Sequence, residues 1–322
     1  MKTAFRLIMT TLLFVSAASL LEAQAPAVNH NTWTSGAAMP VALNWPATGV
    51  IGSKIYVVGG YTGGPASADN QIYNAATNTW STGAPIPDAT GQATAAVVKN
   101  ILYVFGGSSN GCGAVFNTVW AYSPKTNSWS AKTAMPTARC SATAVVDKSN
   151  IIHVIGGYNG SRLTTVEAYD PATDSWTEEA GLRLGKSEIS AGLFGNAKTG
   201  YTIVAADGFS GSDTGDNEEY DIATNAWTDL ASDPNPRNGS CFGVIGTKLY
   251  ASDGNASGNN PISVMEAFNP AKNTWTSLAA MPNTLTDSGS AVYKGQLYCI
   301  GGGNWAVPPN NTVYNYVQIY QP

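Results

Sequence analysis

The chain has 322 residues, of which 43% are hydrophobic, and this supply of apolar side chains is ample for a core and argues against disorder. Only 11% of the residues are charged, whereas there are 34 glycines and 17 prolines, a composition that favours short strands joined by tight turns. The formal net charge is −5, and because Lys and Arg are not clustered the chain is a poor candidate for binding nucleic acid.

The first 25 residues have the features of a secretory signal peptide. Lys2 and Arg6 precede an apolar stretch over residues 7–21, and small residues follow. We place cleavage between residues 23 and 27, where Pro26 makes the Ala25 bond a poor site. The alternative is an uncleaved membrane anchor, but the stretch is short for a membrane span, and no later stretch is long and apolar enough. The sequence therefore predicts a secreted or periplasmic protein with no membrane span after cleavage.

A repeat organises the rest of the chain. Residues 31–40 (NTWTSGAAMP) return nearly unchanged at 273–282 (NTWTSLAAMP), with looser copies at 78–87 and 127–136. Tryptophans recur at intervals of 47, 49, 47, 51 and 48 residues: Trp33, Trp80, Trp129, Trp176, Trp227 and Trp275. An aromatic residue precedes each later tryptophan by seven positions: Tyr73, Tyr122, Tyr169, Tyr220 and Phe268. A marker pair follows a short apolar run in each repeat: Gly59-Gly60, Gly106-Gly107, Gly156-Gly157, Asp207-Gly208, Asp253-Gly254 and Gly301-Gly302.

These motifs resemble the kelch repeat, which combines a Gly-Gly pair, a spaced Tyr and Trp, and a Met-Pro turn. The resemblance extends from Trp33 to Tyr320, so it covers most of the chain. It implies an all-β, six-bladed kelch-type β-propeller over residues 31–322, with one four-stranded antiparallel sheet in each blade. Stacking the blades around an axis buries the faces that a single blade would expose.

The last repeat lacks its outer strand. Residues 311–320 end in the expected aromatic, Tyr320, and no tryptophan strand follows. Residues 31–35 supply the missing strand, so we expect them to pair with the C-terminal strand and close the ring. Closure removes the strand edges that an open ring would expose.

Small residues and acidic residues mark particular places in the repeats. The positions twelve residues before each marker pair are small, as expected for inner strands crowded around an axis: Ala47, Thr94, Ala144, Gly195, Cys241 and Gly289. The fourth repeat departs most from the pattern, because Asp207 replaces the first marker glycine and its first two strands span a longer region, residues 186–206. In the acidic loop that follows, Asp213, Asp216 and Glu218 are candidate Ca²⁺ ligands, although the spacing is not that of an EF-hand and a solvated loop is the alternative.

Four cysteines in a secreted chain invite disulfide pairing. Cys112 follows the second strand of the second repeat and Cys140 begins the third repeat, and these connections share one face of neighbouring blades. We therefore expect a Cys112–Cys140 disulfide, worth about 3–4 kcal/mol in the loop-entropy treatment. Cys241 and Cys299 occupy core positions and are interpreted as buried free thiols.

The two histidines restrict the available chemistry. A copper radical oxidase of the galactose oxidase kind also has kelch blades, but its metal site needs two His, two Tyr and a Tyr-linked Cys. His30 precedes the first strand, and His153 occupies a strand position that holds Tyr in other repeats, so it is interpreted as a core residue. The sequence has no nucleophile elbow, Walker loop or zinc signature, and no cofactor is expected.

The loops after the second strand of each repeat differ in length and sequence while the strands repeat, as binding loops on a rigid scaffold do. The candidate ligand-binding aromatics on this face are Trp45, Tyr61, Tyr158, Phe209 and Trp305. Aromatic side chains in a concave mouth suit sugar faces or peptide side chains. The alternative is that they pack on neighbouring loops.

Few polar groups are expected near the mouth. Arg139 and Arg237 occupy the usual kelch arginine position, and in the kelch adaptors of ubiquitin ligases arginines on this face bind acidic peptides. With Glu188 and Asp287 they form a candidate acid/base set, for which a structural salt bridge is the alternative. Glu188 falls in the longer region of the fourth repeat, so the repeat pattern does not fix its position.

Two functions follow from these residues. The preferred one is a secreted, monomeric binding or interaction module that takes a carbohydrate, protein or peptide ligand on its loop face. The alternative is a sugar-active enzyme similar to a periplasmic N-acetylneuraminate epimerase, whose acid/base chemistry needs an Arg for the sugar carboxylate and a nearby Glu or His. A cell-surface structural module is a third possibility, and it would need an anchor or a partner domain.

Overall fold

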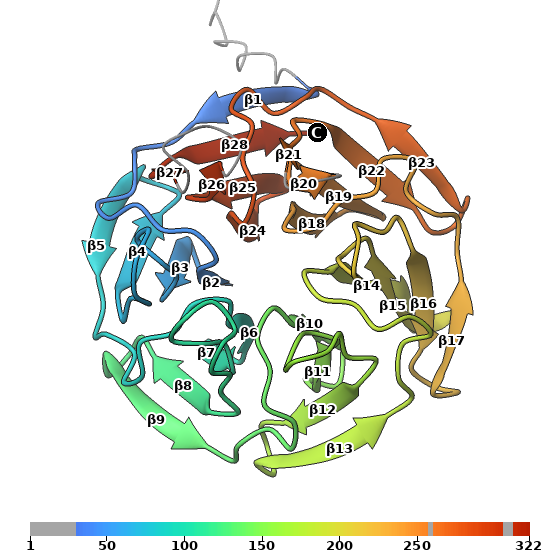
Figure 1. The fold of residues 1–322 in the computed structure, drawn as a ribbon, viewed down its shortest axis with the longest axis horizontal. Coiled ribbons are helices and arrows are strands. Elements are labelled where there is room, and N and C mark those ends of the chain that lie inside the picture. The colour runs from blue at the N-terminus through green and yellow to red at the C-terminus, as the bar shows by residue number, and fades with distance from the viewer. Residues whose placement is uncertain (1–29, 257–259, 305–311) are drawn as a thin grey trace, which may run out of the picture.

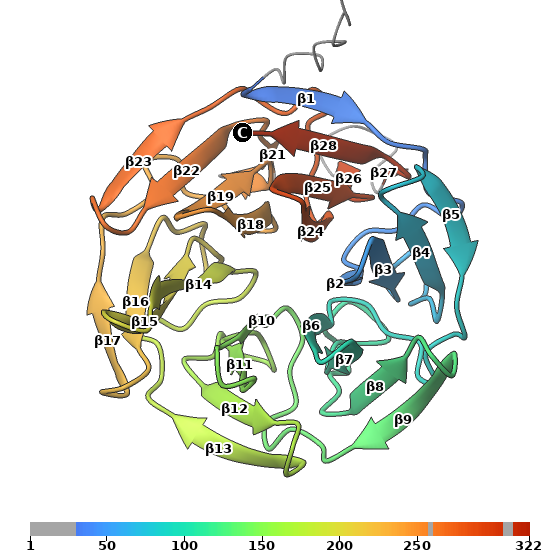
Figure 2. The ribbon, with the colours of Figure 1, turned by 180° about the vertical axis from the view of Figure 1, so that it is seen from behind.

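Four-stranded antiparallel sheets arranged around a central axis make up this protein (Figures 1 and 2). The computed structural model describes residues 30–256, 260–304 and 312–322. It confirms the predicted six-bladed β-propeller. The signal peptide predicted over residues 1–25 lies outside the described residues and stays a prediction. Within the described ranges no helix is long and apolar enough to cross a membrane.

The blades are numbered in chain order, and each blade contributes one strand to each of four concentric layers. The innermost strands are β2 (Ala47–Ile51), β6 (Thr94–Val98), β10 (Thr143–Val146), β14 (Ser190–Asn196), β18 (Cys241–Ile245) and β24 (Gly289–Tyr293). The second strands are β3 (Lys54–Val58), β7 (Ile101–Phe105), β11 (Ile152–Ile155), β15 (Gly200–Ala206), β19 (Lys248–Ser252) and β25 (Gln296–Ile300). The third strands are β4 (Asn70–Asn74), β8 (Val119–Ser123), β12 (Val166–Asp170), β16 (Asn217–Asp221), β22 (Met265–Asn269) and β28 (Val317–Gln321). The outer strands are β5 (Thr79–Thr82), β9 (Ser128–Lys132), β13 (Ser175–Glu179), β17 (Ala226–Asp229), β23 (Thr274–Ser277) and β1 (Thr32–Ser35).

Two short ribbons extend the loops of the last two blades. They are β20 (Asn255–Ala256) with β21 (Asn260–Pro261), and β26 (Gly303–Asn304) with β27 (Thr312–Val313).

The ring closes as the sequence predicts. Strand β1 lies outside β28 in blade six, and the pairing places Thr32 opposite Gln321 and Trp33 opposite Tyr320 (Figure 1). The Trp33 indole packs against the Tyr320 ring and donates a hydrogen bond to the carbonyl of Ala279 in blade five. The first strand of the chain therefore joins the last two blades.

The repeated Tyr, Asn and Trp side chains hold neighbouring blades together, which explains why their spacing is kept. In blade one the Tyr73 hydroxyl donates to Asn78 Oδ1, and the same oxygen accepts the backbone N–H of Ala37. Trp80 Nε1 then donates to the Ala37 carbonyl. The same pattern recurs through Asn127, Asp174, Asn225, Asn273 and Asn31, with Phe268 taking the tyrosine place in blade five. The motif is thus a lattice of bonds near the rim of the ring.

The innermost strands are lined by small residues, but the sequence count was wrong in two blades. The residues at the start of β10 and β14 are Thr143 and Ser190, where the count gave Ala144 and Gly195. The hairpin between the first two strands has one additional residue in blade three and several more in blade four, where both strands have seven residues. Gly195 consequently lies at the far end of β14, away from the mouth.

Candidate functional site

Six residues, one from each blade, surround the axis where the chain enters each innermost strand. They are Trp45, Gln92, Ser141, Glu188, Gly239 and Asp287. All six have positive φ, between 49° and 63°. Positive φ is uncommon for residues other than glycine, and such outliers gather at functional sites. We call these six residues the mouth ring.

The backbone of the mouth ring is bonded from blade to blade. The N–H of each residue donates to the carbonyl of its counterpart in the preceding blade at five of the six steps: Trp45 to Asp287, Gln92 to Trp45, Ser141 to Gln92, Glu188 to Ser141, and Asp287 to Gly239. These bonds, 2.7–3.1 Å long, fix the positions from which the side chains project. At the sixth step, among the described residues, the Gly239 N–H does not donate to the Glu188 carbonyl.

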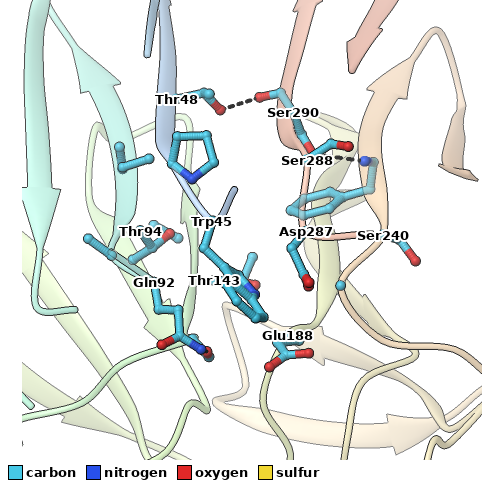
Figure 3. Close-up of a pocket in the computed structure, with 18 of the residues that line it drawn as sticks. Trp45, Thr48, Gln92, Thr94, Thr143, Glu188, Ser240, Asp287, Ser288 and Ser290 are labelled. Carbon is cyan, nitrogen blue, oxygen red and sulfur yellow. Dashed lines mark hydrogen bonds between the residues drawn. The ribbon is translucent and has the colours of Figure 1, made fainter. Parts of the chain in front are cut away.

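The side chains of the mouth ring border a cavity of about 270 Å³ on the axis (Figure 3). Its deeper wall consists mainly of small residues of the innermost strands, such as Thr48, Thr94 and Ser290. Trp45 contributes an indole that is partly exposed to the cavity, and its ring meets Tyr61 edge-on with centroids 6.1 Å apart. The cavity lining includes no Lys or Arg.

Glu188 belongs to the mouth ring, although the greater length of the fourth repeat left its position open in the sequence. The additional residues of the fourth repeat lie in the β14–β15 hairpin, beyond Glu188, so the residue keeps its register. Burial raises the pKa of the Glu188 carboxyl to about 7, and Asp213 contributes to the rise. Arg162 and a hydrogen bond from Ser141 act in the opposite direction. Glu188 is therefore poised to exchange a proton near neutral pH.

Asp287 lies in the mouth ring two blades after Glu188, separated from it by Gly239, and is buried against this glycine. A Cβ at Gly239 would collide with the Asp287 carboxylate, so a larger residue there would have to displace that side chain. The structure brings Glu188 and Asp287 to one cavity, with Gln92 and Trp45 (Figure 3).

Three of the five predicted aromatics, Tyr61, Tyr158 and Phe209, occupy one repeat position, directly after the marker pair. Tyr61 is buried, packs on Gly91, and links two loops by donating to the Ser108 carbonyl and accepting from the Gly111 N–H. Tyr158 and Phe209 are partly exposed. Trp305 lies outside the described residues.

Tyr158 and Phe209 enclose a residue that the sequence analysis did not single out, Arg162. Its guanidinium carbon lies 4.3 Å from the Tyr158 ring centroid and 4.7 Å from that of Phe209. Tyr158 and Arg162 belong to blade three and Phe209 to blade four, so the stack spans the blade boundary. Loop residues follow no repeat consensus, and nothing in the spacing indicated this contact.

The arginines proposed from the kelch position lie away from the cavity. Arg139 is buried, with its guanidinium bonded to Glu167 at 2.5 Å and to the carbonyls of Gly156 and Thr165. Arg237 is equally buried and pairs with Glu266 and with Asp233. The structure therefore does not bring these arginines together with Glu188, and it gives them the salt-bridge role named as the alternative.

Blade four carries a lysine at the same position, which the sequence analysis missed. Lys186 pairs with Glu218, so blades three, four and five each have a cation matched to a glutamate on the third strand. Blades one and six have Leu and Gln in these two places: Leu43 with Gln71, and Leu285 with Gln318. At these two places in the five blades, a buried charge thus occurs only where its counter-charge does.

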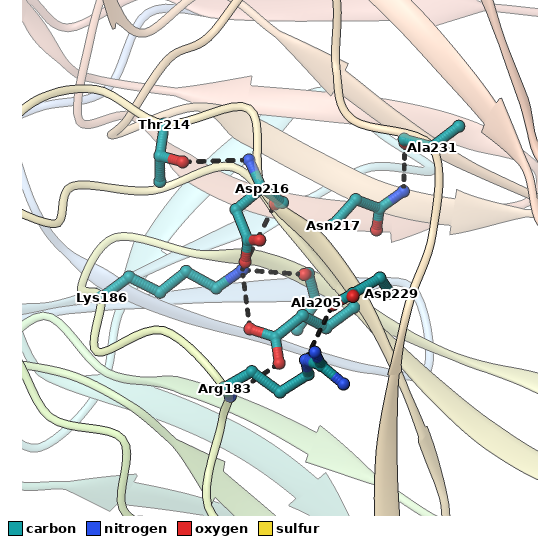
Figure 4. Close-up of polar contacts among 9 residues, drawn as sticks. Arg183, Lys186, Ala205, Thr214, Asp216, Asn217, Asp229 and Ala231 are labelled. Carbon is teal, nitrogen blue, oxygen red and sulfur yellow. Dashed lines mark hydrogen bonds and ion pairs between the residues drawn. The ribbon is translucent and has the colours of Figure 1, made fainter.

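The three candidate Ca²⁺ ligands do not form one site. The Lys186 ammonium lies 2.6 Å from Asp216 (Figure 4) and 3.6 Å from Glu218. Asp213 instead accepts a hydrogen bond from Asn238. Among the described residues no group of three or more His, Cys, Asp or Glu side chains could hold a metal ion.

Acidic groups outnumber cations between blades four and five. Asp207, Asp233 and Glu266 surround Arg237, and all four side chains are buried. Burial raises the pKa of Asp207 to about 6 and those of Asp233 and Glu266 to about 7, with mutual repulsion adding to the last two.

The structure contains two disulfides. Cys112–Cys140 joins the loop of blade two to the start of blade three beside the mouth. Cys241–Cys299 joins the first strand of blade five to the second strand of blade six, so the interpretation of these two as free thiols was wrong. Each residue fills a regular core position in its own blade, and only the stacking of blades brings the two together.

His153 is buried inside blade three and bonds to Glu179 at 2.7 Å, with its ring packed against Tyr220. It lies away from the mouth ring, in the strand position held by tyrosine elsewhere.

Comparisons with known proteins agree with this architecture. Residues 27–185 match the model of the KLHDC2/KLHL20/DRC7 Kelch-repeats domain, and residues 236–282 match the Kelch motif. None of the curated proteins matches the chain in sequence. A solved structure titled "Structure of YjhT" is similar with a TM-score of 0.75 at 18% sequence identity, over 88% of this chain and 96% of that chain. At this identity the likeness shows the shared fold.

Proposed function

We propose that this kelch-repeat propeller binds a small saccharide at the mouth of its axial cavity. The observation that supports the proposal is the mouth ring, where one indole, one amide and two carboxyl groups border a single cavity of about 270 Å³. Ligand sites in proteins combine an apolar wall with a few well-placed polar groups. A cavity of this size suits one sugar ring rather than a folded partner.

The chemistry of the ring fits a polyhydroxylated ligand. The Trp45 indole offers an apolar face to the C–H groups of a pyranose, while Gln92, Glu188 and Asp287 can bond its hydroxyls. Because the ring backbone is already bonded from blade to blade, little conformational entropy is lost when a ligand orders these side chains.

A binding assay with matched variants tests the proposal. Calorimetric titration with a panel of neutral and acidic monosaccharides and disaccharides should give saturable binding to the wild type. Trp45→Asn keeps a residue that tolerates positive φ and should weaken binding at least about tenfold. The control Trp120→Thr removes an indole from the third strand of blade two, remote from the cavity, and should leave affinity unchanged. Absence of binding to every sugar in the panel would overturn the proposal.

One observation favours a second candidate, an acid/base reaction on the bound sugar such as ring opening and epimerisation. The Glu188 carboxyl, with a pKa of about 7, can give or take a proton at neutral pH, and Asp287 shares its cavity. NMR exchange spectroscopy would detect faster anomer interconversion with the wild type than with Glu188→Gln. Glu178→Gln, an exposed carboxyl on the outer strand β13, is the matched control. Equal exchange rates with wild type and Glu188→Gln would exclude this role.

A further inference from the structure

Arg162 is a cation held in place beside the mouth ring. Its guanidinium carbon lies over the Tyr158 ring and over the Phe209 ring, so two cation–π contacts hold the group. The N–H donors of a guanidinium lie in its plane and point outward from the edge. Contacts with ring faces therefore restrain the group without using its N–H donors.

The donors at this edge are not used by the protein. Arg162 Nε is buried and has no hydrogen-bond partner, and no carboxylate in the described part of the chain forms an ion pair with Arg162. A buried donor left unsatisfied costs free energy. The fully buried cations of neighbouring blades, Arg139, Lys186 and Arg237, all have such partners.

We infer that Arg162 binds an oxyanion, a carboxylate or a phosphate, carried by the sugar in the mouth. The inference rests on the proposed function and deepens it, because it names the class of sugar. Tyr158 and Phe209 form β-bridges with Cys140 and Ser187, which directly precede Ser141 and Glu188 of the mouth ring. The two rings therefore place Arg162 beside the part of the mouth that Ser141 and Glu188 line, where its N–H groups would meet an oxyanion of the bound sugar. A planar guanidinium is suited to donate two parallel hydrogen bonds to one oxyanion.

The surrounding acids make the binding depend on pH. Glu188 faces Arg162, Asp213 and the Ser141 hydroxyl, and Asp213 is itself held by Asn238. An ionised Glu188 repels an arriving anion, whereas a protonated one does not. Since the pKa of Glu188 is about 7, a sugar carboxylate, which stays ionised over this range, should bind more tightly at pH 6 than at pH 8.

Three ligands that share one ring test the inference: glucose, glucuronate and glucose 6-phosphate. For the wild type at pH 6, at least one of the two anionic sugars should bind about tenfold more tightly than glucose. The preference between carboxylate and phosphate identifies the source of the oxyanion. Arg162→Gln should lose the anionic preference and retain glucose binding. The control Arg183→Gln removes an exposed arginine whose partner is Asp229, and it should behave as the wild type does.

The outcomes separate the two proposals. Equal affinity for all three sugars, or an anionic preference that survives in Arg162→Gln, overturns the role of Arg162 and leaves the saccharide site standing. Absence of binding by any sugar overturns both. The preference of Glu188→Gln for glucuronate over glucose should be independent of pH between 6 and 8, because the carboxylate of glucuronate stays ionised over this range. A preference of this variant for glucuronate that still decreases as the pH rises contradicts the part assigned to Glu188. Unchanged melting temperatures of the variants show that folding is intact.

Discussion

The buried carboxyl of Asp207 gives a prediction whose size and sign follow from the structure. Asp207 stands where four other blades have glycine, at a φ of 61°, and its side chain has no exposed surface. Neither carboxyl oxygen has a hydrogen-bond donor among the described residues. Burial raises the pKa of this group from 3.8 to about 6, although Arg237 and Lys186 partly offset the rise.

Replacement of Asp207 by Asn removes the charge and keeps a residue that tolerates positive φ. A carboxyl whose pKa rises on folding binds its proton more tightly in the folded state, so its stabilising contribution is complete below about pH 4 and is lost as the pH rises through about 6. The loss amounts to about 3 kcal/mol. Asp207→Asn should therefore be more stable than the wild type at pH 8 by up to about 3 kcal/mol, and nearly equal to it at pH 4.

Urea unfolding of both proteins at pH 4, 6 and 8 measures this difference directly. Asp253→Asn, in the equivalent position of blade five, should also be more stable than the wild type at pH 8, because burial raises the pKa of Asp253 well above its ordinary value despite hydrogen bonds from the Cys241 N–H and the Ser288 hydroxyl. The control is Glu178→Gln, which removes an exposed carboxyl of the outer strand β13 and should leave the stability nearly unchanged at all three pH values. A gain for Asp207→Asn that is the same at pH 4 and pH 8 would refute the electrostatic explanation, because a neutral amide differs from Asp207 only where the acid is ionised.

Three further predictions concern contacts between and within blades. The double variant Cys241→Ala, Cys299→Val removes a disulfide whose cysteines are 58 residues apart, and it should lose up to about 4 kcal/mol of stability in calorimetry without reductant. A melting temperature equal to that of the wild type would contradict the idea that this disulfide stabilises the contact between blades five and six. Arg139→Leu should cost about 3–5 kcal/mol because it leaves Glu167 buried without a counter-charge, and adding Glu167→Gln, which recreates the Leu–Gln pair of blades one and six, should restore most of that loss in chemical denaturation. Trp33→Ala should destabilise the ring by about 2 kcal/mol, since the half-buried indole joins blades five and six, and unaltered resistance to proteolysis would argue against the closing role of β1.

The fold could be predicted because its signals are periodic and local. The Tyr, Asn and Trp side chains of each repeat bond the next blade, so their spacing is visible in one sequence. The missing outer strand at the end of the chain and the surplus strand at its beginning likewise indicated closure. Counting from fixed markers was wrong where the hairpin between the first two strands had changed length, by one residue in blade three and by several in blade four, which misplaced Ala144 and Gly195 and obscured the register of Glu188.

The parts that could not be predicted depend on contacts between blades that have no fixed spacing. Cys241 and Cys299 each look like ordinary core residues, and only the packing of β18 against β25 makes them partners. Arg162 lies in a loop without a consensus, and its second aromatic neighbour, Phe209, comes from another blade. Lys186 was detectable, since it stands 47 residues after Arg139 and 51 before Arg237, the same intervals as the tryptophans of these blades.

In each blade, the contacts that hold the ring together are separate from the side chains that line the mouth, and this explains why the mouth varies while the ring does not. The Tyr–Asn–Trp lattice holds the blades together near the rim, and the mouth ring holds them at the axis through backbone bonds alone. A backbone bond is indifferent to the side chain that its residue carries, provided that the residue accepts a positive φ. Side chains as different as Trp45, Ser141 and Glu188 therefore stand at equivalent positions without weakening the ring. The mouth can change its chemistry from one blade to the next at little cost in stability, and this is the property that a ligand-binding tier needs.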